Sequence, residues 1–171
     1  MKNIILVGMP GFGKSTLGET LAQTLRYHYI DTDEVIMETY GKNLMELIEQ
    51  HGIEGFIVLE GKVISSIYTN RAVISTGGSA IYYPDAMAHL RASGKVIYLY
   101  HDISDLYNRV GDMVERGVVC RENCNTLEAL FAERSPLYEQ YADYVIDMTG
   151  KNLTTCNAML LDVVYAHGLG T

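Results

Sequence analysis

The chain has 171 residues, 48% of them hydrophobic and 20% charged, which are the proportions of a globular protein and predict a single domain over residues 1–171. Its net charge of −8 argues against general nucleic-acid binding, which needs a basic face. No apolar segment is long enough to cross a membrane, and three cysteines follow no secretory signal, so we expect a cytoplasmic protein with free thiols.

The first predicted strand, residues 3–7, runs directly into the segment 8–15, which fits the spacing G-x-x-x-x-G-K-[ST]. An amphipathic helix is predicted behind it, at 15–26. Such a turn points several backbone N–H groups at one place and binds a triphosphate, with Lys14 reaching the outer phosphates and Ser15 offering its hydroxyl to Mg²⁺. The alternative is a tight connection without a ligand. The expected nucleotide-binding residues here are Gly11, Phe12, Gly13, Lys14, Ser15 and Thr16.

Beyond this loop, short apolar strands alternate with longer helical segments. This alternation predicts an α/β fold, a three-layer α/β/α sandwich whose central parallel sheet has about five strands. Ligands of such sheets bind at the carboxyl ends of the strands, where Asp31, residues 75–79 and His101 fall. Further strands are expected at 27–31, 72–75, 95–100 and 143–147, and helices at 53–69, 84–92, 102–112, 126–141 and 152–166.

Two segments fit this alternation poorly. Residues 32–60 form an acidic insertion after the second strand. Residues 111–125 are charged and irregular, and we expect them to be a lid that closes over ATP and excludes water, although a solvated loop is the alternative. Arg109 and Arg116 flank this lid, and each is either exposed or in contact with adenine or the transferred phosphate.

Asp31 and Asp33 follow the second strand at a spacing of two. One carboxylate could lie near Mg²⁺ through water while the other accepts a proton from an attacking hydroxyl. The pattern equally suits the N-terminal cap of a following helix.

Glu60 and Arg134 both lie on the apolar sides of predicted helices. A charge facing inward is costly unless it is paired. The two could form salt bridges for architecture, for example with each other, or Arg134 could hold an anionic substrate group. Gly77 and Gly78 after the third strand form either an ordinary turn or a close backbone approach to substrate.

Taken together, these segments resemble the shikimate kinases, within the P-loop nucleoside-monophosphate-kinase-like group. The family transfers the γ-phosphate of ATP to the 3-hydroxyl of shikimate. The resemblance implies that Lys14 and Ser15 serve ATP and Mg²⁺, with Asp31 near the metal, and that Asp33 is the base. It also implies that Gly77, Gly78 and Arg134 hold the substrate and that the insertion at 32–60 binds it too. Arg109 would stack on adenine, and Arg116 would close over the phosphate. The matching segments are 8–15, 31–33, 52–56 with Glu60, 75–78, Arg116 and 134–138.

The departures from this family pattern concentrate at the substrate. Ile57 stands where the family has an arginine that grips the shikimate carboxylate, Ser79 replaces a third glycine, and Gly117 replaces a proline. Loss of a buried arginine–carboxylate pair costs ~2–5 kcal/mol, which lowers affinity roughly thirtyfold to several thousandfold. With Glu60 competing for Arg134, we expect a substrate with a weaker anionic group, or none.

The sequence therefore predicts a monomeric kinase that uses ATP and Mg²⁺ on a small-molecule substrate, with shikimate as the first acceptor to test. The alternatives are a kinase of the same fold for another hydroxylated metabolite and a nucleotide-binding protein without transfer activity. An adenylate kinase is disfavoured because the acceptor region has too few cations for a second nucleotide. A switch GTPase is disfavoured because no Asn-Lys-x-Asp motif occurs.

Overall fold

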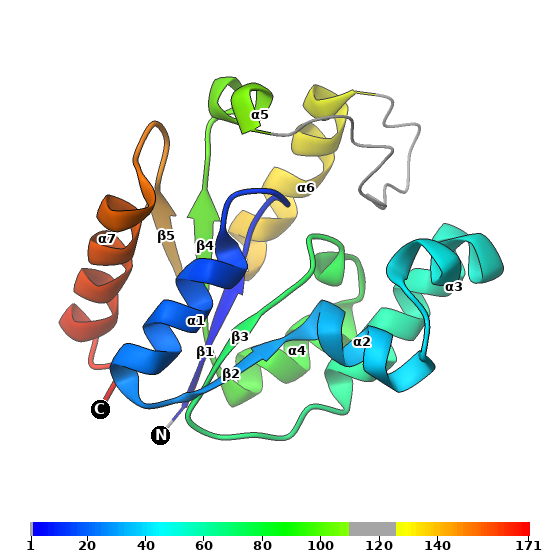
Figure 1. Ribbon diagram of the computed structural model, residues 1–171, viewed down its shortest axis with the longest axis horizontal. Helices are drawn as coiled ribbons and strands as arrows, with labels where there is room; N and C mark the ends of the chain where they lie inside the picture. Colours follow the sequence, from blue (N-terminus) through cyan, green and yellow to red (C-terminus); the bar gives the residue numbers. More distant parts are fainter. Residues whose placement is uncertain (1, 110–125) are drawn as a thin grey trace.

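The computed structural model describes residues 2–109 and 126–171, and within them five strands form one parallel sheet (Figure 1). The strand order is β2-β3-β1-β4-β5, and every neighbouring pair is parallel. The predicted α/β fold is confirmed, because each strand returns through a helical crossover. The strands are β1 (Asn3–Val7), β2 (His28–Asp31), β3 (Ala72–Ser75), β4 (Gly94–Tyr100) and β5 (Tyr144–Asp147).

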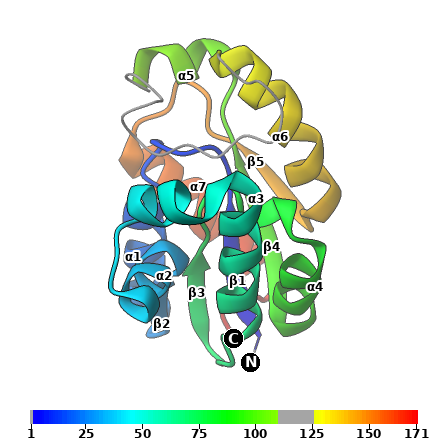
Figure 2. The same cartoon turned by 90° about the vertical axis from the view of Figure 1, so that its right-hand side faces the viewer.

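Helices cover both faces of this sheet, as Figures 1 and 2 show. Alternate residues of β1 point to opposite faces: Ile4 and Leu6 pack with α1 and α7, while Ile5 and Val7 pack with α4 and α6. The central strand is therefore apolar throughout, as expected for a sheet buried on two sides. These helices are α1 (Lys14–Leu25), α4 (Pro84–Ser93), α6 (Leu127–Tyr141) and α7 (Leu153–Ala166).

The predicted insertion is a pair of helices, α2 (Thr32–Tyr40) and α3 (Leu44–Ser65), that projects beside the sheet (Figure 1). The expected helix at 53–69 matches the part of α3 that follows the break at Gly52, but α3 ends at Ser65 rather than at 69. A capping box of Asn43 and Glu46 starts α3 earlier, and the helical run continues across a break at Gly52 (φ 69°, ψ 175°). The pair has its own apolar cluster, which also includes Tyr82: Ile36, Leu47, Phe56, Ile57, Leu59, Val63 and Tyr82.

The remaining elements are the short 3₁₀ helix η1 (Ala80–Tyr82) and α5 (Ile103–Arg109). The predicted helix at 102–112 is thus described only as far as 109, and the predicted lid lies outside the described residues. Cys156 is buried, and its thiol donates to the carbonyl oxygen of Lys151 at 3.9 Å. Of the helices that the structure describes, none has the length and apolar character to span a bilayer.

Candidate active site

The glycine-rich segment connects the carboxyl end of β1 to the first turn of α1. Gly13 precedes the helix with φ 71°, a left-handed conformation that glycine adopts without steric cost. The Lys14 ammonium group donates to the carbonyl oxygens of Gly8 (3.2 Å) and Met9 (3.4 Å). Burial lowers the pKa of Lys14 to about 8, while the nearby charge of Asp33 opposes that shift. The loop therefore presents one cation and a set of backbone amides.

A cleft of about 250 Å³ opens in front of this loop. Its walls come from three places at the carboxyl edge of the sheet: the phosphate loop, the end of β2 and the segment after β3. Both chain ends lie at the opposite edge (Figures 1 and 2). The lining residues are Pro10, Gly11, Gly13, Lys14, Ser15, Asp31, Asp33, Thr76, Gly77 and Gly78.

The side chains of Asp31 and Ser15 place two oxygen atoms next to each other in the cleft, where they could serve as metal ligands. The Ser15 hydroxyl donates to Asp31 Oδ2 at 2.9 Å, and Asp31 Oδ1 accepts the backbone N–H of Asp33 at 2.9 Å. Asp31 therefore caps α2, as one interpretation predicted, while its other oxygen lies beside Ser15. Across 2–109 and 126–171, no cluster of three potential ligands could hold a metal alone. The pair suits Mg²⁺, which takes few protein oxygens and binds mainly phosphates and water.

Asp33 lines the same cleft from the first turn of α2. Burial, and then the charge of Asp31, raise the pKa of Asp33 to about 6. A Cβ atom placed on Gly77 would lie only 2.4 Å from Asp33 Oδ1, so glycine is needed for the carboxylate to lie there. The Gly77 amide donates to Thr32 Oγ1 (3.1 Å) and is thus already used within the protein.

Arg134 comes from α6 and is 1% exposed. Its Nε donates to the hydroxyl of Tyr82 at 3.3 Å. At Gly78, a Cβ atom would lie 2.3 Å from Arg134 Nη1, and the Gly78 carbonyl accepts the hydroxyl of Tyr138 at 2.8 Å. The missing side chain at 78 therefore lets the guanidinium group reach the edge of the cleft.

Glu60 and Ile57 lie behind the cleft on α3. Ile57 is 1% exposed and belongs to the apolar cluster of the α2–α3 pair. Glu60 Oε1 accepts the hydroxyl of Ser79 at 2.7 Å, and burial raises the pKa of Glu60 to about 7. No salt bridge joins Glu60 to Arg134 among the described residues, although the charge of Arg134 lowers the pKa of Glu60 against the effect of burial. The hydrogen-bond partner of Glu60 is Ser79, the residue in place of a third glycine.

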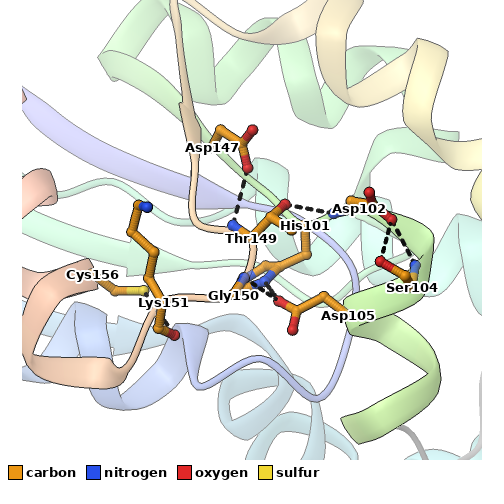
Figure 3. Close-up of polar contacts among 9 residues, drawn as sticks. All are labelled: His101, Asp102, Ser104, Asp105, Asp147, Thr149, Gly150, Lys151 and Cys156. Atoms are coloured by element: carbon orange, nitrogen blue, oxygen red, sulfur yellow. Dashed lines mark hydrogen bonds and ion pairs between the residues drawn. The ribbon is translucent and has the colours of Figure 1, made fainter.

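A second polar cluster lies behind the phosphate loop, between α5 and the turn after β5 (Figure 3). His101 Nδ1 lies 2.7 Å from Asp105 Oδ2, which also accepts the amide of Gly150 (3.3 Å). The amide of Asp102 donates to Thr149 Oγ1 at 2.9 Å. The ring of Phe12 stacks on His101, with centroids 4.0 Å apart. The cluster thus connects the phosphate loop, residues 8–15, to the start of α5 and to the turn after β5.

The structure brings most of the predicted site residues together. Phe12 and Ile57 differ, because their side chains are buried against other protein groups, and Thr16 lies exposed on α1 outside the cleft lining. Arg109 ends α5, and neither its side chain nor Arg116 belongs to the described part. The residues in one place are Gly11, Gly13, Lys14, Ser15, Asp31, Asp33, Gly77 and Gly78, with Arg134 at Gly78.

Two tyrosines at this site were missed from the sequence. Tyr138 stands four residues after Arg134, on the same side of α6, and this spacing was a usable signal. Tyr82 had no such signal, because η1 meets α6 only in the folded chain.

Comparisons with known proteins agree on one family. The family model that matches is that of shikimate kinase, over residues 10–164. A shikimate kinase of Francisella tularensis subsp. holarctica is 38% identical over 87% of this chain and 86% of its own. The solved shikimate kinase of Acinetobacter baumannii, in complex with shikimate, has a TM-score of 0.85 at 28% identity, covering 99% of this chain and 96% of its own. That of Aquifex aeolicus has a TM-score of 0.81 at 26% identity, covering 99% of both chains.

Proposed function

This chain belongs to the shikimate kinase family, whose members are ATP-dependent phosphotransferases with an alcohol as acceptor, and on that premise we propose that it phosphorylates a ring hydroxyl of shikimate or a close relative. The observation that carries the proposal is the convergence of Lys14, Ser15 and Asp33 in one cleft, with Arg134 at its edge. These groups supply the parts that phosphoryl transfer needs: a phosphate cradle, a metal ligand, a base and a substrate cation.

The donor is held by the phosphate loop. The first N–H groups of α1, which a helix leaves without partners of its own, and the ammonium group of Lys14 bind the phosphates. Lys14 then exchanges its carbonyl partners for phosphate oxygens. Mg²⁺ would be held by Ser15, with Asp31 beside it, and when bound it neutralises charge on the outer phosphates. The side chains thus position the terminal phosphate at the mouth of the cleft.

The acceptor is held on the other side. Asp33, with a pKa of about 6, is mainly ionised at neutral pH, so it can accept the proton of the attacking hydroxyl. Arg134 at Gly78 binds the acceptor from the α6 side.

The role of the predicted lid is tested at Arg116. If this residue contacts the transferred phosphate, Arg116→Ala lowers kcat more than it lowers the affinity for ATP. Equal losses would mean that Arg116 only helps to bind ATP.

The test is ADP release by the purified chain with Mg·ATP and a panel of hydroxylated metabolites that includes shikimate. Acceptor-dependent ADP release, absent from Lys14→Ala, supports the kinase. ATP binding without acceptor-dependent release from any compound contradicts it and favours a nucleotide-binding protein without transfer. Action as a monomer and a cytoplasmic location are predictions from the sequence.

A further inference from the structure

A buried carboxylate oxygen at the acceptor end of the cleft has no partner. Glu60 is 1% exposed, and its Oε1 accepts the hydroxyl of Ser79. Among the residues that the structure describes, nothing donates a hydrogen bond to its Oε2. Buried acceptors are nearly always satisfied in folded proteins, so an exception of this kind needs an explanation.

The free oxygen lies close to Gly77, beside the cleft. A Cβ atom placed on Gly77 would lie 3.1 Å from Glu60 Oε2 and 2.4 Å from Asp33 Oδ1. Gly77 itself lines the cleft. The two carboxylates therefore meet at this glycine from different helices, and a molecule seated against Gly77 would have both within reach.

The cation expected beside Glu60 is missing. Ile57 lies three residues before Glu60, on the same side of α3, where the family resemblance calls for an arginine. Its side chain is buried among apolar neighbours, so no charged group from this position reaches the carboxylate. Arg134 donates to Tyr82 and lies at Gly78, so its charge acts on Glu60 from a distance and without a salt bridge. Lys14 acts on Asp33 from the donor side. Among the described residues, Glu60 thus has no cation beside it.

We infer that the acceptor subsite selects a hydroxylated molecule that presents a hydrogen-bond donor, a hydroxyl or an ammonium group, to Glu60 Oε2, in preference to one that presents a carboxylate there. The inference rests on the proposed function, because it concerns the end of the acceptor remote from the transferred phosphate. The preference applies above pH 7, where Glu60 is ionised. There a donor would satisfy the orphaned oxygen, whereas a carboxylate would meet Glu60 without the second cation that offsets the repulsion.

The test compares acceptors that differ at one carbon. Shikimate is set against its analogues in which the carboxylate becomes a hydroxymethyl or an aminomethyl group, while the ring hydroxyls stay the same. Dissociation constants by calorimetry and kcat/KM by ADP release are both measured on the full chain. We expect at least one analogue to bind about tenfold tighter than shikimate. Tighter binding of the hydroxymethyl compound would show a preference for a neutral donor, and tighter binding of the aminomethyl compound a preference for a cationic one.

Variants assign the preference to Glu60. Glu60→Gln should lower the affinity of the preferred analogue by about tenfold or more and leave that of shikimate within about threefold. Glu49→Gln, an exposed substitution of the same kind on α3, should change neither. Ile57→Arg should reverse the ranking in favour of shikimate, while Ile57→Leu, which keeps the apolar volume, should not. Unfolding curves of each variant show whether it is folded.

The outcomes separate this inference from the proposed function. Tighter binding of shikimate than of both analogues by the wild-type chain overturns the inference, as does an equal loss for all acceptors in Glu60→Gln. Because binding is measured directly, the order of affinities decides the inference even if no acceptor releases ADP, a result that would contradict the kinase proposal alone.

Discussion

The donor side and the acceptor side of the cleft differ in how fully their residues match the chemistry expected of them. On the donor side, the phosphate loop, Lys14 and the Ser15–Asp31 pair lie together in the arrangement that binds a nucleotide. On the acceptor side, Ile57 is part of an apolar cluster and Glu60 has an unsatisfied oxygen. The two sides meet at Asp33 and Gly77, where a Cβ atom placed on the glycine would lie 2.4 Å from Asp33 Oδ1.

This difference shows that the two specificities of a kinase are separable. A triphosphate is recognised mainly through backbone amides and one lysine, so few side-chain substitutions other than those at the lysine abolish ATP binding. An acceptor is recognised by side chains on helices outside the sheet, and one substitution there changes the balance of charge. Variants on the donor side should therefore affect all acceptors alike, whereas variants on the acceptor side should change their order of preference.

The largest effect is expected from Lys14→Ala. Loss of the ammonium group removes charge stabilisation from the transferred phosphate, and we expect kcat/KM to fall by about 10³-fold or more with every acceptor. Steady-state ADP release measures this, with Lys42→Ala, an exposed lysine, as the control. If the loss of kcat/KM differed strongly from one acceptor to another, the donor side and the acceptor side would not act independently.

Asp33→Asn should lower kcat by about 10²–10³-fold, because the amide cannot accept the proton of the attacking hydroxyl. The pH profile sharpens this test. In the wild-type chain, kcat/KM should fall below pH 6 as Asp33 becomes protonated, and the variant should lose that limb. If the low-pH limb persists in the variant, another group is the base.

The stability of the acceptor side should depend on pH through Glu60. Its pKa rises from 4.5 in the unfolded chain to about 7 in the folded one, so the folded state favours the protonated form. The contribution of Glu60 to the free energy of unfolding should thus be largest below pH 4.5. This contribution should fall by about 3 kcal/mol as the pH rises from there through 7. Urea unfolding of the wild type and of Glu60→Gln at a series of pH values measures this change. If the free energy of unfolding depends on pH in the same way in both proteins, Glu60 is not the group responsible.

The smallest effect is expected at His101. Its ring supports Phe12 of the phosphate loop, and a stacked pair contributes about 0.5–1.5 kcal/mol, so His101→Ala should raise KM for ATP roughly two- to tenfold. The ratio of kcat/KM values between acceptors should stay the same, because His101 lies on the donor side. His51→Ala, exposed on α3, is the control. A changed acceptor ratio would show that the two sides are coupled.

Local patterns predicted the donor side well. The glycine spacing, the apolar strand before Gly8 and the helix after Lys14 are all contiguous in the chain, so periodicity and motif were sufficient. The predicted sheet followed from the same regular alternation. The helix containing Glu60 was predicted from its break at Gly52 onward. The turns before this break were missed as part of the helix, because their start depends on a capping box at Asn43.

Contacts between distant segments were beyond the sequence patterns. The bond between Ser79 and Glu60 joins the turn before η1 to α3, and the stack of Phe12 on His101 joins the phosphate loop to the end of β4. No spacing rule links such positions, since only the folded topology brings them together. The substitution at Ile57 could be seen in the sequence, but the free oxygen of Glu60 required the structure.

The separate apolar cluster of the α2–α3 pair has an evolutionary consequence. Ile36, Leu47 and their neighbours form a cluster apart from the two cores that face the sheet, although Ile64 of α3 packs into one of those cores. We therefore expect substitutions within this cluster to disturb the strands little. New acceptors can then be sampled by mutation in a lineage while ATP use is inherited unchanged. An isoleucine at position 57 is the kind of change that such an arrangement tolerates, and duplicated genes of this fold would diverge first at these two helices.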